Sequence, residues 1–289
     1  MPETTRRLII QGAAKLASAG IENSRLAAEA MLAAVCHTSR AAVISGLVEI
    51  DHPGRQRYSA MIARRMRQEP LAYIVGRKEF YSLEFEVTPA VLIPRPETET
   101  VVTEALEFLQ DRIHTHVCDL GTGSGAIALA IAANAPTARL SATDVSDRAL
   151  AIARRNAARF KLESHVRFRL ADCFEPLDGE GPLGRFALFV SNPPYIGDDE
   201  MSGLPAEIRC YEPHTALAGG PDGLDFYRRI ALQMPAHLEP DGCAIMEVGA
   251  GKSSAVIEIM CNSGARSTRL IPDLAGIPRV VVANFNPSK

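Results

Sequence analysis

Four consecutive residues in the second half of the chain carry the clearest chemical signal. Asn192, Pro193, Pro194 and Tyr195 directly follow residues 186–191, an apolar run typical of a buried strand. Two successive prolines fix φ and remove two backbone donors, so the turn is stiff and rich in acceptors. The Asn192 side-chain oxygen and the Pro193 carbonyl can accept both hydrogens of a planar –NH2 group, while Tyr195 offers a flat face. The turn therefore suits binding and aiming an amide or amino nitrogen, although alone it also fits a structural loop.

A second motif, the glycine turn in VCDLGTGSGAIALAIA, lies between an expected strand and a helix. Gly121, Gly123 and Gly125 lack Cβ atoms, so the backbone can turn sharply and a ligand can lie against it. Asp144 ends the next expected strand, 23 residues after Gly121, where a carboxylate can accept both hydroxyls of a ribose. The spacing matches neither a dinucleotide fingerprint nor a phosphate loop. A ribose ligand without a pyrophosphate, such as S-adenosylmethionine, fits best.

One further acid could belong to the same site. Asp172 follows the expected strand at 166–170 and could accept a hydrogen bond from an adenine amino group. A loop cap is an equally good interpretation of this residue on its own.

The elements around these motifs predict a doubly wound sheet. Apolar runs alternate with helix-length stretches, which favours a mostly parallel α/β sheet. The last two runs are separated only by PDLAGIP, so we expect an antiparallel hairpin there. In the expected strand order, the strand before Asn192 lies beside the strand before Gly121, and both loops face one crevice. The expected strands are 117–120, 139–143, 166–170, 186–191, 243–248, 266–271 and 279–285.

The beginning of the chain predicts a different structure. We expect a small helical domain over 1–76, a β-hairpin and linker over 77–95, and the α/β domain over 96–289.

Several helix details are also predicted. Ser24 is the expected N-cap of a helix that places Leu26, Ala30 and Ala33 on one face. A later helix is expected to bury Ile113.

Charge is distributed unevenly along the 289 residues. The net charge is −3, yet residues 1–80 carry 12 Lys and Arg against 7 Asp and Glu. The acidic remainder argues against a stable nucleic-acid partner. The basic first part is either an ordinary solvated surface or a docking surface for an acidic partner. Its expected second helix has an arginine-rich face formed by Arg57, Arg64, Arg65 and Arg67.

Composition excludes other classes of protein. No run of 18 apolar residues is present, so we expect no membrane span. Six cysteines without a CxxC pair suit a reducing cytoplasm rather than a disulfide framework. We expect no metal site, because two nearby histidines, His114 and His116, lack a third ligand. A monomer is expected, since no apolar patch is evident.

The motifs together resemble a known family. DLGTGSG (119–125), Asp144 and NPPY (192–195) are similar to the motifs of class I S-adenosylmethionine-dependent amino methyltransferases. Three further segments resemble the protein-(glutamine-N5) methyltransferases of peptide chain release factors, the PrmC/HemK family: RKEFYS (77–82), LIPRPETE (92–99) and EPHTALAGGPDGLDFYRRI (212–230). The resemblance covers nearly the whole chain. It implies the class I methyltransferase sheet with an all-helical N-terminal domain, and methyl transfer to the glutamine of the release factors' Gly-Gly-Gln loop.

The resemblance also implies roles for particular residues. The implied cofactor-binding residues are Gly121, Thr122, Gly123, Ser124, Gly125, Asp144, Asp172, Cys173 and Asn192. The implied catalytic residues are Asn192, Pro193 and Tyr195, and the implied substrate-binding residues are Asn192, Pro193, Pro194, Tyr195 and Arg95. Family members often carry an aromatic residue where Cys173 stands, and Phe174 is expected to supply some stacking instead.

Three rival interpretations remain at this point. NPPY is shared with adenine-N6 nucleic-acid methyltransferases, which would reach the same –NH2 geometry by base flipping. A related enzyme methylates a ribosomal-protein glutamine, although IPRPETE matches the release-factor branch better. A cofactor-binding scaffold without activity would have no need of an aimed pair of acceptors.

Overall fold

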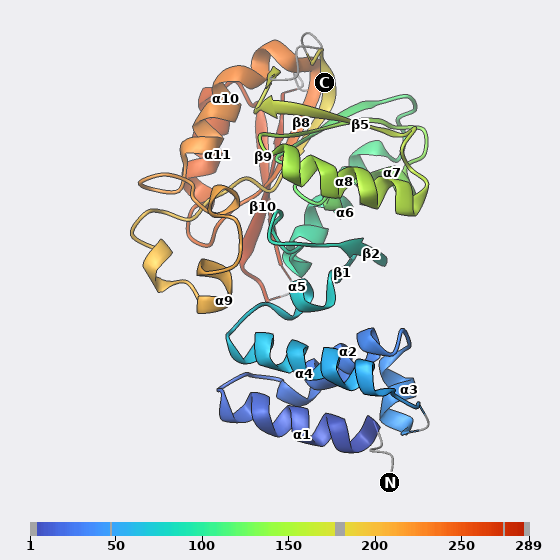
Figure 1. Ribbon diagram of the computed structural model, residues 1–289. Helices are drawn as coiled ribbons and strands as arrows, with labels where there is room; N and C mark the ends of the chain where they lie inside the picture. Colours follow the sequence, from blue (N-terminus) through green and yellow to red (C-terminus); the bar gives the residue numbers. More distant parts are fainter. Residues whose placement is uncertain (1–4, 47, 177–182, 274, 286–289) are drawn as a thin grey trace. The chain divides into compact units, whose positions relative to one another are not determined.

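The computed structural model describes residues 5–46, 48–176, 183–273 and 275–285 (Figure 1). Contacts between Cα atoms divide the chain into two compact units. The helical unit consists of Met1–Arg77 together with Pro205–Tyr211, and the sheet unit consists of Lys78–Leu204 and Glu212–Lys289. The sequence analysis did not anticipate that a segment after residue 200 belongs to the helical unit. Within the described residues, no helix is both long and apolar enough to span a bilayer.

The helical unit is built on amphipathic helices that enclose one apolar cluster. Leu16, Met31, Leu32 and Val43 at its centre are fully buried. The buried Tyr58 hydroxyl donates to a backbone carbonyl of the first helix, at 3.2 Å. The helices are α1 (Thr5–Ser18), α2 (Ser24–Val35), α3 (Arg40–Ser45), α4 (His52–Met66), α5 (Leu71–Val75) and α9 (Ala206–Arg209).

One expectation about α2 was wrong. The residue before its first turn is Asn23, which has a left-handed backbone and makes no side-chain cap, so Ser24 is the first helical residue. Leu26 is 45% exposed, whereas the neighbouring Ala27 and Ala28 are buried. The helix contacts α1, α3, α4 and α5, and Ala33 on the same predicted face as Leu26 is buried, so that face is only partly covered.

The arginine-rich face of α4 is partly engaged within its own unit. Arg64 pairs with Glu69, and Arg65 pairs with Glu207 at 2.9 Å. The Arg65 side chain is only 12% exposed. These two arginines therefore join α4 to Glu69, which follows the helix, and to the segment 205–211. Two of the four arginines of the predicted docking face are thus paired within the helical unit.

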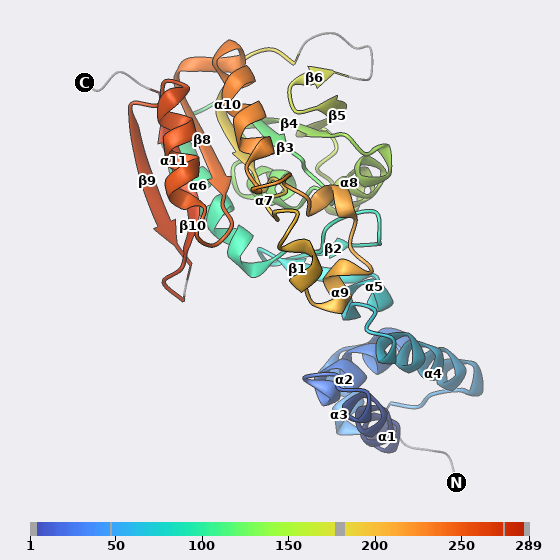
Figure 2. The ribbon, with the colours of Figure 1, turned by 90° about the vertical axis from the view of Figure 1, so that its left-hand side faces the viewer.

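The sheet unit contains the doubly wound sheet that was predicted. Its strand order is β6-β5-β4-β3-β7-β8-β10-β9 (Figure 2). The five strands from β5 to β8 are mutually parallel, whereas β10 is antiparallel to both β8 and β9. The expected C-terminal hairpin is thus confirmed, and the short antiparallel β6 was not predicted. The strands are β3 (His116–Leu120), β4 (Arg139–Asp144), β5 (Val166–Asp172), β6 (Glu175–Pro176), β7 (Phe186–Ser191), β8 (Leu238–Glu247), β9 (Ser267–Pro272) and β10 (Pro278–Asn284).

Helices cover both faces of this sheet, because successive strand residues point to opposite sides. Val117 belongs to the cluster that includes α6 and α7, whereas Cys118 belongs to the cluster that includes α10 and α11. The longer helices of the unit are α6 (Glu99–Leu109), α7 (Ala126–Asn134), α8 (Asp147–Phe160), α10 (Asp225–His237) and α11 (Ser253–Asn262). Shorter elements are η1 (Pro96–Thr98), η2 (Met201–Gly203), η3 (His214–Ala216), and the two-stranded hairpin of β1 (Arg77–Phe80) and β2 (Leu83–Glu86).

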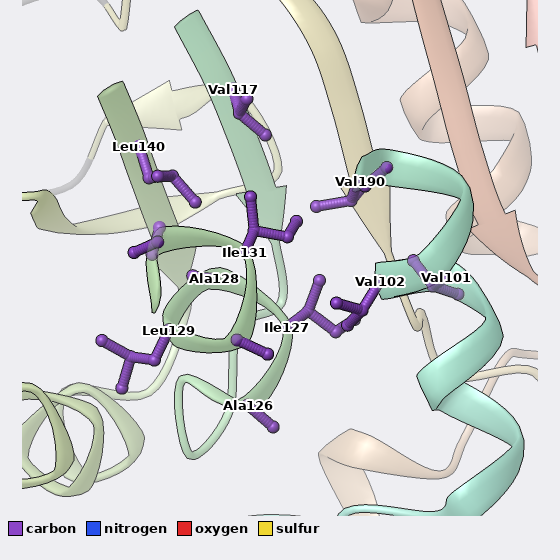
Figure 3. Packing of buried hydrophobic residues seen from close by; sticks show 14 of the residues in the cluster. Val101, Val102, Val117, Ala126, Ile127, Ala128, Leu129, Ile131, Leu140 and Val190 are labelled. Carbon is purple, nitrogen blue, oxygen red and sulfur yellow. The ribbon is translucent and has the colours of Figure 1, made fainter. Parts of the chain in front are cut away.

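The helix after the glycine turn, α7, is apolar on all sides and is almost completely buried. Ile131 points toward Val117 and Val190 of two neighbouring strands, and Ile127 points toward Val102 of α6 (Figure 3). This packing fixes where the glycine turn lies relative to the sheet. The prediction for Ile113 was wrong: it is 75% exposed, because α6 ends at Leu109 and the chain turns away there.

Candidate methyl-transfer site

The two predicted motifs meet at one edge of the sheet. The strands β3 and β7 are parallel neighbours, with Leu120 paired to Ser191, so the loops that follow them begin side by side. The Ser191 hydroxyl donates to the Leu120 carbonyl at 2.7 Å and joins the two loop bases. A cavity opens there that encloses about 1030 Å³, part of it open to solvent. Its wall is mainly apolar with a few polar groups, as is typical of small-molecule sites.

Most of the predicted site residues line this cavity. They are Gly121, Thr122, Gly123, Ser124, Asp144, Asp172, Cys173, Asn192, Pro193 and Pro194. Among the described wall residues, Gly125, Tyr195 and Arg95 do not occur.

The three glycines have different surroundings. Gly121 and Gly123 have φ of +73° and +58°, and a Cβ on either would meet no protein atom within 4 Å. A Cβ on Gly125 would lie 2.9 Å from Leu129 Cδ1 and 3.3 Å from the Ala153 Cβ. The first two glycines thus leave space for a ligand, whereas Gly125 allows α7 to pack closely on α8.

Asp144 is held where its carboxylate can still accept further hydrogen bonds. Its Oδ2 accepts from the Gly123 amide and its Oδ1 from the Ser146 amide, each at 2.9 Å. Burial raises the pKa of Asp144, and the two amides oppose that shift. Each carboxylate oxygen has a second lone pair for a hydroxyl. The open space at the glycines and this anchored acid fit the predicted ribose ligand.

A second acid, which the sequence analysis did not single out, stabilises the glycine turn from the protein interior. Asp119 is fully buried, and its Oδ2 accepts from the Thr122 hydroxyl at 2.6 Å and the Ala128 amide at 3.2 Å. Its Oδ1 has no partner among the described residues. Burial raises the pKa of Asp119 to about 7. Its place directly before the glycine motif is the signal that could have identified it.

The far end of the cavity contains the residues expected near adenine. Asp172 pairs with Arg229 at 2.7 Å, and Cys173 takes a left-handed backbone with φ of +54°. The stacking expected from Phe174 is not supported, because its ring packs on His237 inside the sheet unit and is absent from the described cavity wall. Phe226 of α10 is the aromatic residue that lines the cavity instead.

The NPPY turn is anchored by residues outside the motif. The Asn192 Nδ2 donates to the Thr98 hydroxyl at 3.1 Å, and the Tyr195 hydroxyl donates to Glu247 Oε1 at 3.2 Å. Glu247 ends β8, and burial raises its pKa to about 7. The predicted contact of Tyr195 with a substrate stays a prediction, since the structure gives it an anchoring role.

Arg95 is similarly engaged away from the cavity. It pairs with the buried Glu212, whose other oxygen accepts from the Ile93 amide at 3.3 Å. Its predicted contact with the substrate also stays a prediction.

Comparisons with known proteins now decide between the rival interpretations. Residues 7–76 match the family model described as the PrmC N-terminal domain, and residues 102–205 match the methyltransferase small domain. The chain is 41% identical over 268 residues to the release factor glutamine methyltransferase of Koribacter versatilis, covering 92% of this chain and 93% of that protein. It is 40% identical over 282 residues to the protein of the same name from Moorella thermoacetica, covering 97% and 98%.

The chain belongs to the release factor glutamine methyltransferase family. The predicted resemblance is thereby confirmed, and so is the class I methyltransferase fold. A methyltransferase from Pyrococcus furiosus has this fold, with a TM-score of 0.52 and 19% identity over 79% of this chain and all of that one. The hMettl16 catalytic domain in complex with MAT2A 3'UTR hairpin 6 shares it too, with a TM-score of 0.57 and 16% identity over 85% and 87%.

The family was predicted from the sequence, whereas the residues that anchor the NPPY turn were not. Thr98 and Glu247 lie 149 residues apart in the sequence and meet only because η1 lies against the end of β8. Thr98 is part of the PETE segment that the sequence analysis used only for the resemblance. Glu247 has no motif signal beyond an acid at the end of an apolar strand.

Proposed function

We propose that this protein transfers a methyl group from S-adenosylmethionine to the side-chain amide nitrogen of the glutamine in the Gly-Gly-Gln loop of peptide chain release factors. One observation carries the proposal. Asn192 lines the cavity that the glycine turn and Asp144 also line, with its Nδ2 bonded to Thr98. Its Oδ1 has no hydrogen-bond partner among the described residues and can accept from a substrate –NH2 group. The names of the curated relatives support the choice of release factors.

The residues that would hold S-adenosylmethionine lie on one side of the cavity. Gly121 and Gly123 leave space beside their Cα atoms, and the Asp144 carboxylate can accept the ribose hydroxyls. Phe226 and Cys173 line the part expected to border the adenine. The bound cofactor supplies a methyl group made electrophilic by its positively charged sulfur.

Asn192 and Pro193 would act on the substrate nitrogen. An amide nitrogen is a weak nucleophile because its lone pair is delocalised into the carbonyl. If Asn192 Oδ1 and the Pro193 carbonyl accept its two hydrogens, electron density on the nitrogen increases and its lone pair is aimed at the methyl group. Proximity and preorganised dipoles would then provide the catalysis, so no residue has to remove a proton before transfer. The bond between sulfur and the methyl carbon would break as the N–C bond forms, the neutral thioether would leave, and the nitrogen would release its surplus proton afterwards.

The fold alone does not separate this function from action on a nucleic acid, because the hMettl16 catalytic domain, which was solved in complex with a MAT2A 3'UTR hairpin, shares it. The discriminating experiment is transfer of radiolabelled methyl from S-adenosylmethionine to four substrates. They are a purified release factor, its Gln→Ala variant in the Gly-Gly-Gln loop, ribosomal protein and duplex DNA. We expect label in the intact release factor alone. Label in DNA, in ribosomal protein or in the Gln→Ala variant would refute the proposed substrate.

We further propose that the helical unit docks another part of the release factor. The excess of positive charge in residues 1–80 supports an acidic partner surface. Because Arg64 and Arg65 are paired internally, the arginines available for docking include the exposed Arg57.

A further inference from the structure

One buried carboxylate contacts Tyr195 of the substrate-facing turn and is linked to Asn192 through Thr98. Glu247 is 2% exposed, and its two side-chain oxygens accept from two hydroxyl groups. Oε2 accepts from Thr98 Oγ1 at 2.5 Å, and Oε1 accepts from the Tyr195 hydroxyl at 3.2 Å. The Tyr227 hydroxyl donates to the Glu247 backbone carbonyl at 2.7 Å, which fixes the end of β8 itself.

The single hydrogen of the Thr98 hydroxyl determines which groups donate and which accept in this chain of hydrogen bonds. A hydroxyl has one hydrogen to donate, and the Glu247 carboxylate, once ionised above its pKa of about 7, can only accept. In that state the Thr98 hydrogen is committed to Glu247. Its oxygen then has only lone pairs left for Asn192, which lies 3.1 Å away.

This direction determines the orientation of the Asn192 side-chain amide. Its oxygen and nitrogen ends have nearly the same shape, so hydrogen bonding decides which end faces which neighbour. Because the Thr98 oxygen can only accept, Asn192 turns Nδ2 toward it. Its Oδ1 consequently points away from Thr98, as a group that accepts hydrogens from a substrate nitrogen would have to.

We propose that Thr98 is a positioning residue for methyl transfer, which orients the Asn192 amide, and that Glu247 sets the direction of the hydrogen bond that does so. This inference rests on the proposed function. Without the Thr98 hydroxyl, Asn192 can rotate and present –NH2 to the –NH2 of the substrate, and two donors then oppose each other.

Three variants test the role of Thr98. Thr98→Val keeps the branched shape in the cavity wall but removes the hydroxyl, whereas Thr98→Ser keeps the hydroxyl. Thr5→Val is the matched control, because Thr5 is a fully buried threonine of the helical unit whose hydroxyl donates to a carbonyl at 3.2 Å. For each, kcat and KM for the release factor, the S-adenosylmethionine dissociation constant and the thermal unfolding midpoint are measured.

We expect Thr98→Val to lower kcat roughly tenfold, in keeping with the loss of one orienting hydrogen bond. The KM and the cofactor dissociation constant should stay within about twofold of the wild-type values, because binding surfaces are kept. Thr98→Ser should recover most of kcat, and Thr5→Val should leave kcat unchanged.

Two results would overturn the positioning role. One is a Thr98→Val enzyme with wild-type kcat. The other is a variant whose kcat falls only in parallel with cofactor affinity and unfolding midpoint, as a merely structural defect would produce. Absence of transfer by the wild-type enzyme would instead refute the proposed function, so the two failures are distinguishable.

Discussion

Substituting the first glycine of the turn should block the cavity without disturbing any packed atom. Gly121→Ala adds a methyl group at a position where no protein atom lies within 4 Å. Carbon atoms in contact stay about 3.5–4.0 Å apart, so a ligand lying against the Gly121 Cα has to retreat by more than 1 Å. A misplacement of about 1 Å can reduce a rate about 100-fold. We therefore expect kcat/KM to fall about 100-fold and cofactor affinity to fall at least tenfold.

The chain provides a matched control for the backbone strain of this substitution. Gly20 in the helical unit has the same φ of +73°, is exposed and likewise has no atom within 4 Å of an added Cβ. Alanine at φ > 0 costs about 1–2 kcal/mol at either position. Only Gly121 lines the cavity, so only Gly121→Ala should affect methyl transfer.

The assay combines calorimetric titration with S-adenosylmethionine, steady-state methylation of the release factor and urea denaturation of both variants. We expect similar losses of unfolding free energy and a large difference in cofactor affinity. Equal cofactor affinities for Gly121→Ala and Gly20→Ala would refute the assignment of the glycine turn as the cofactor cradle.

Four further outcomes are expected. Asp144→Ala should raise the S-adenosylmethionine dissociation constant tenfold or more, because ribose hydroxyls lose their acceptor; an unchanged titration would contradict the ribose assignment. Asn192→Ala should weaken cofactor binding measurably but largely abolish methyl transfer, and full activity would remove the mechanism. Arg57→Glu should raise the KM for the release factor without affecting cofactor affinity, whereas Arg139→Glu, an exposed charge at the amino end of β4, should change neither. The pKa of Glu247 is raised from 4.5 to about 7, so the stability that its protonated form provides is complete below pH 4.5 and is lost as the pH rises to about 7. The free energy of unfolding of the wild type, relative to that of Glu247→Gln, should therefore fall by up to about 3 kcal/mol between pH 4.5 and 8. A difference that does not depend on pH in urea denaturation would exclude the raised pKa of Glu247.

Local patterns in the sequence predicted the sheet and the two loops well. The apolar runs before Gly121 and Asn192 are fully buried strands, and parallel pairing brings their carboxyl ends together without any further information. Helical spacing alone does not say how much of a face meets the neighbouring helices. On α2, Ala33 is buried whereas Leu26, on the same predicted face, is exposed.

Side-chain anchoring could not be predicted in the same way. The bond between Thr98 and Glu247 joins residues far apart in the sequence, and neither belongs to a spacing pattern with a known chemical reason. Phe174 was expected near the adenine because it is the nearest aromatic residue in sequence. Its ring packs instead on His237, and Phe226 from a distant helix lines the cavity. Tertiary contacts, rather than proximity in sequence, decide which aromatic residue faces a ligand.

The helical unit is formed by two separate segments of the chain, so it cannot be removed by a single cut. Pro205–Tyr211 belongs to that unit, although it is encoded more than 120 residues after Arg77. A fragment cut at Arg77 would lack α9 and would leave Arg65 without Glu207. The complementary fragment would carry the same seven residues without Arg65 and Arg67, to which Glu207 and Tyr211 are bonded, and they begin only ten positions after Tyr195. Deletion of the first 77 residues therefore alters the chain within a few positions of the NPPY turn, and a loss of activity would measure more than the loss of the proposed docking function.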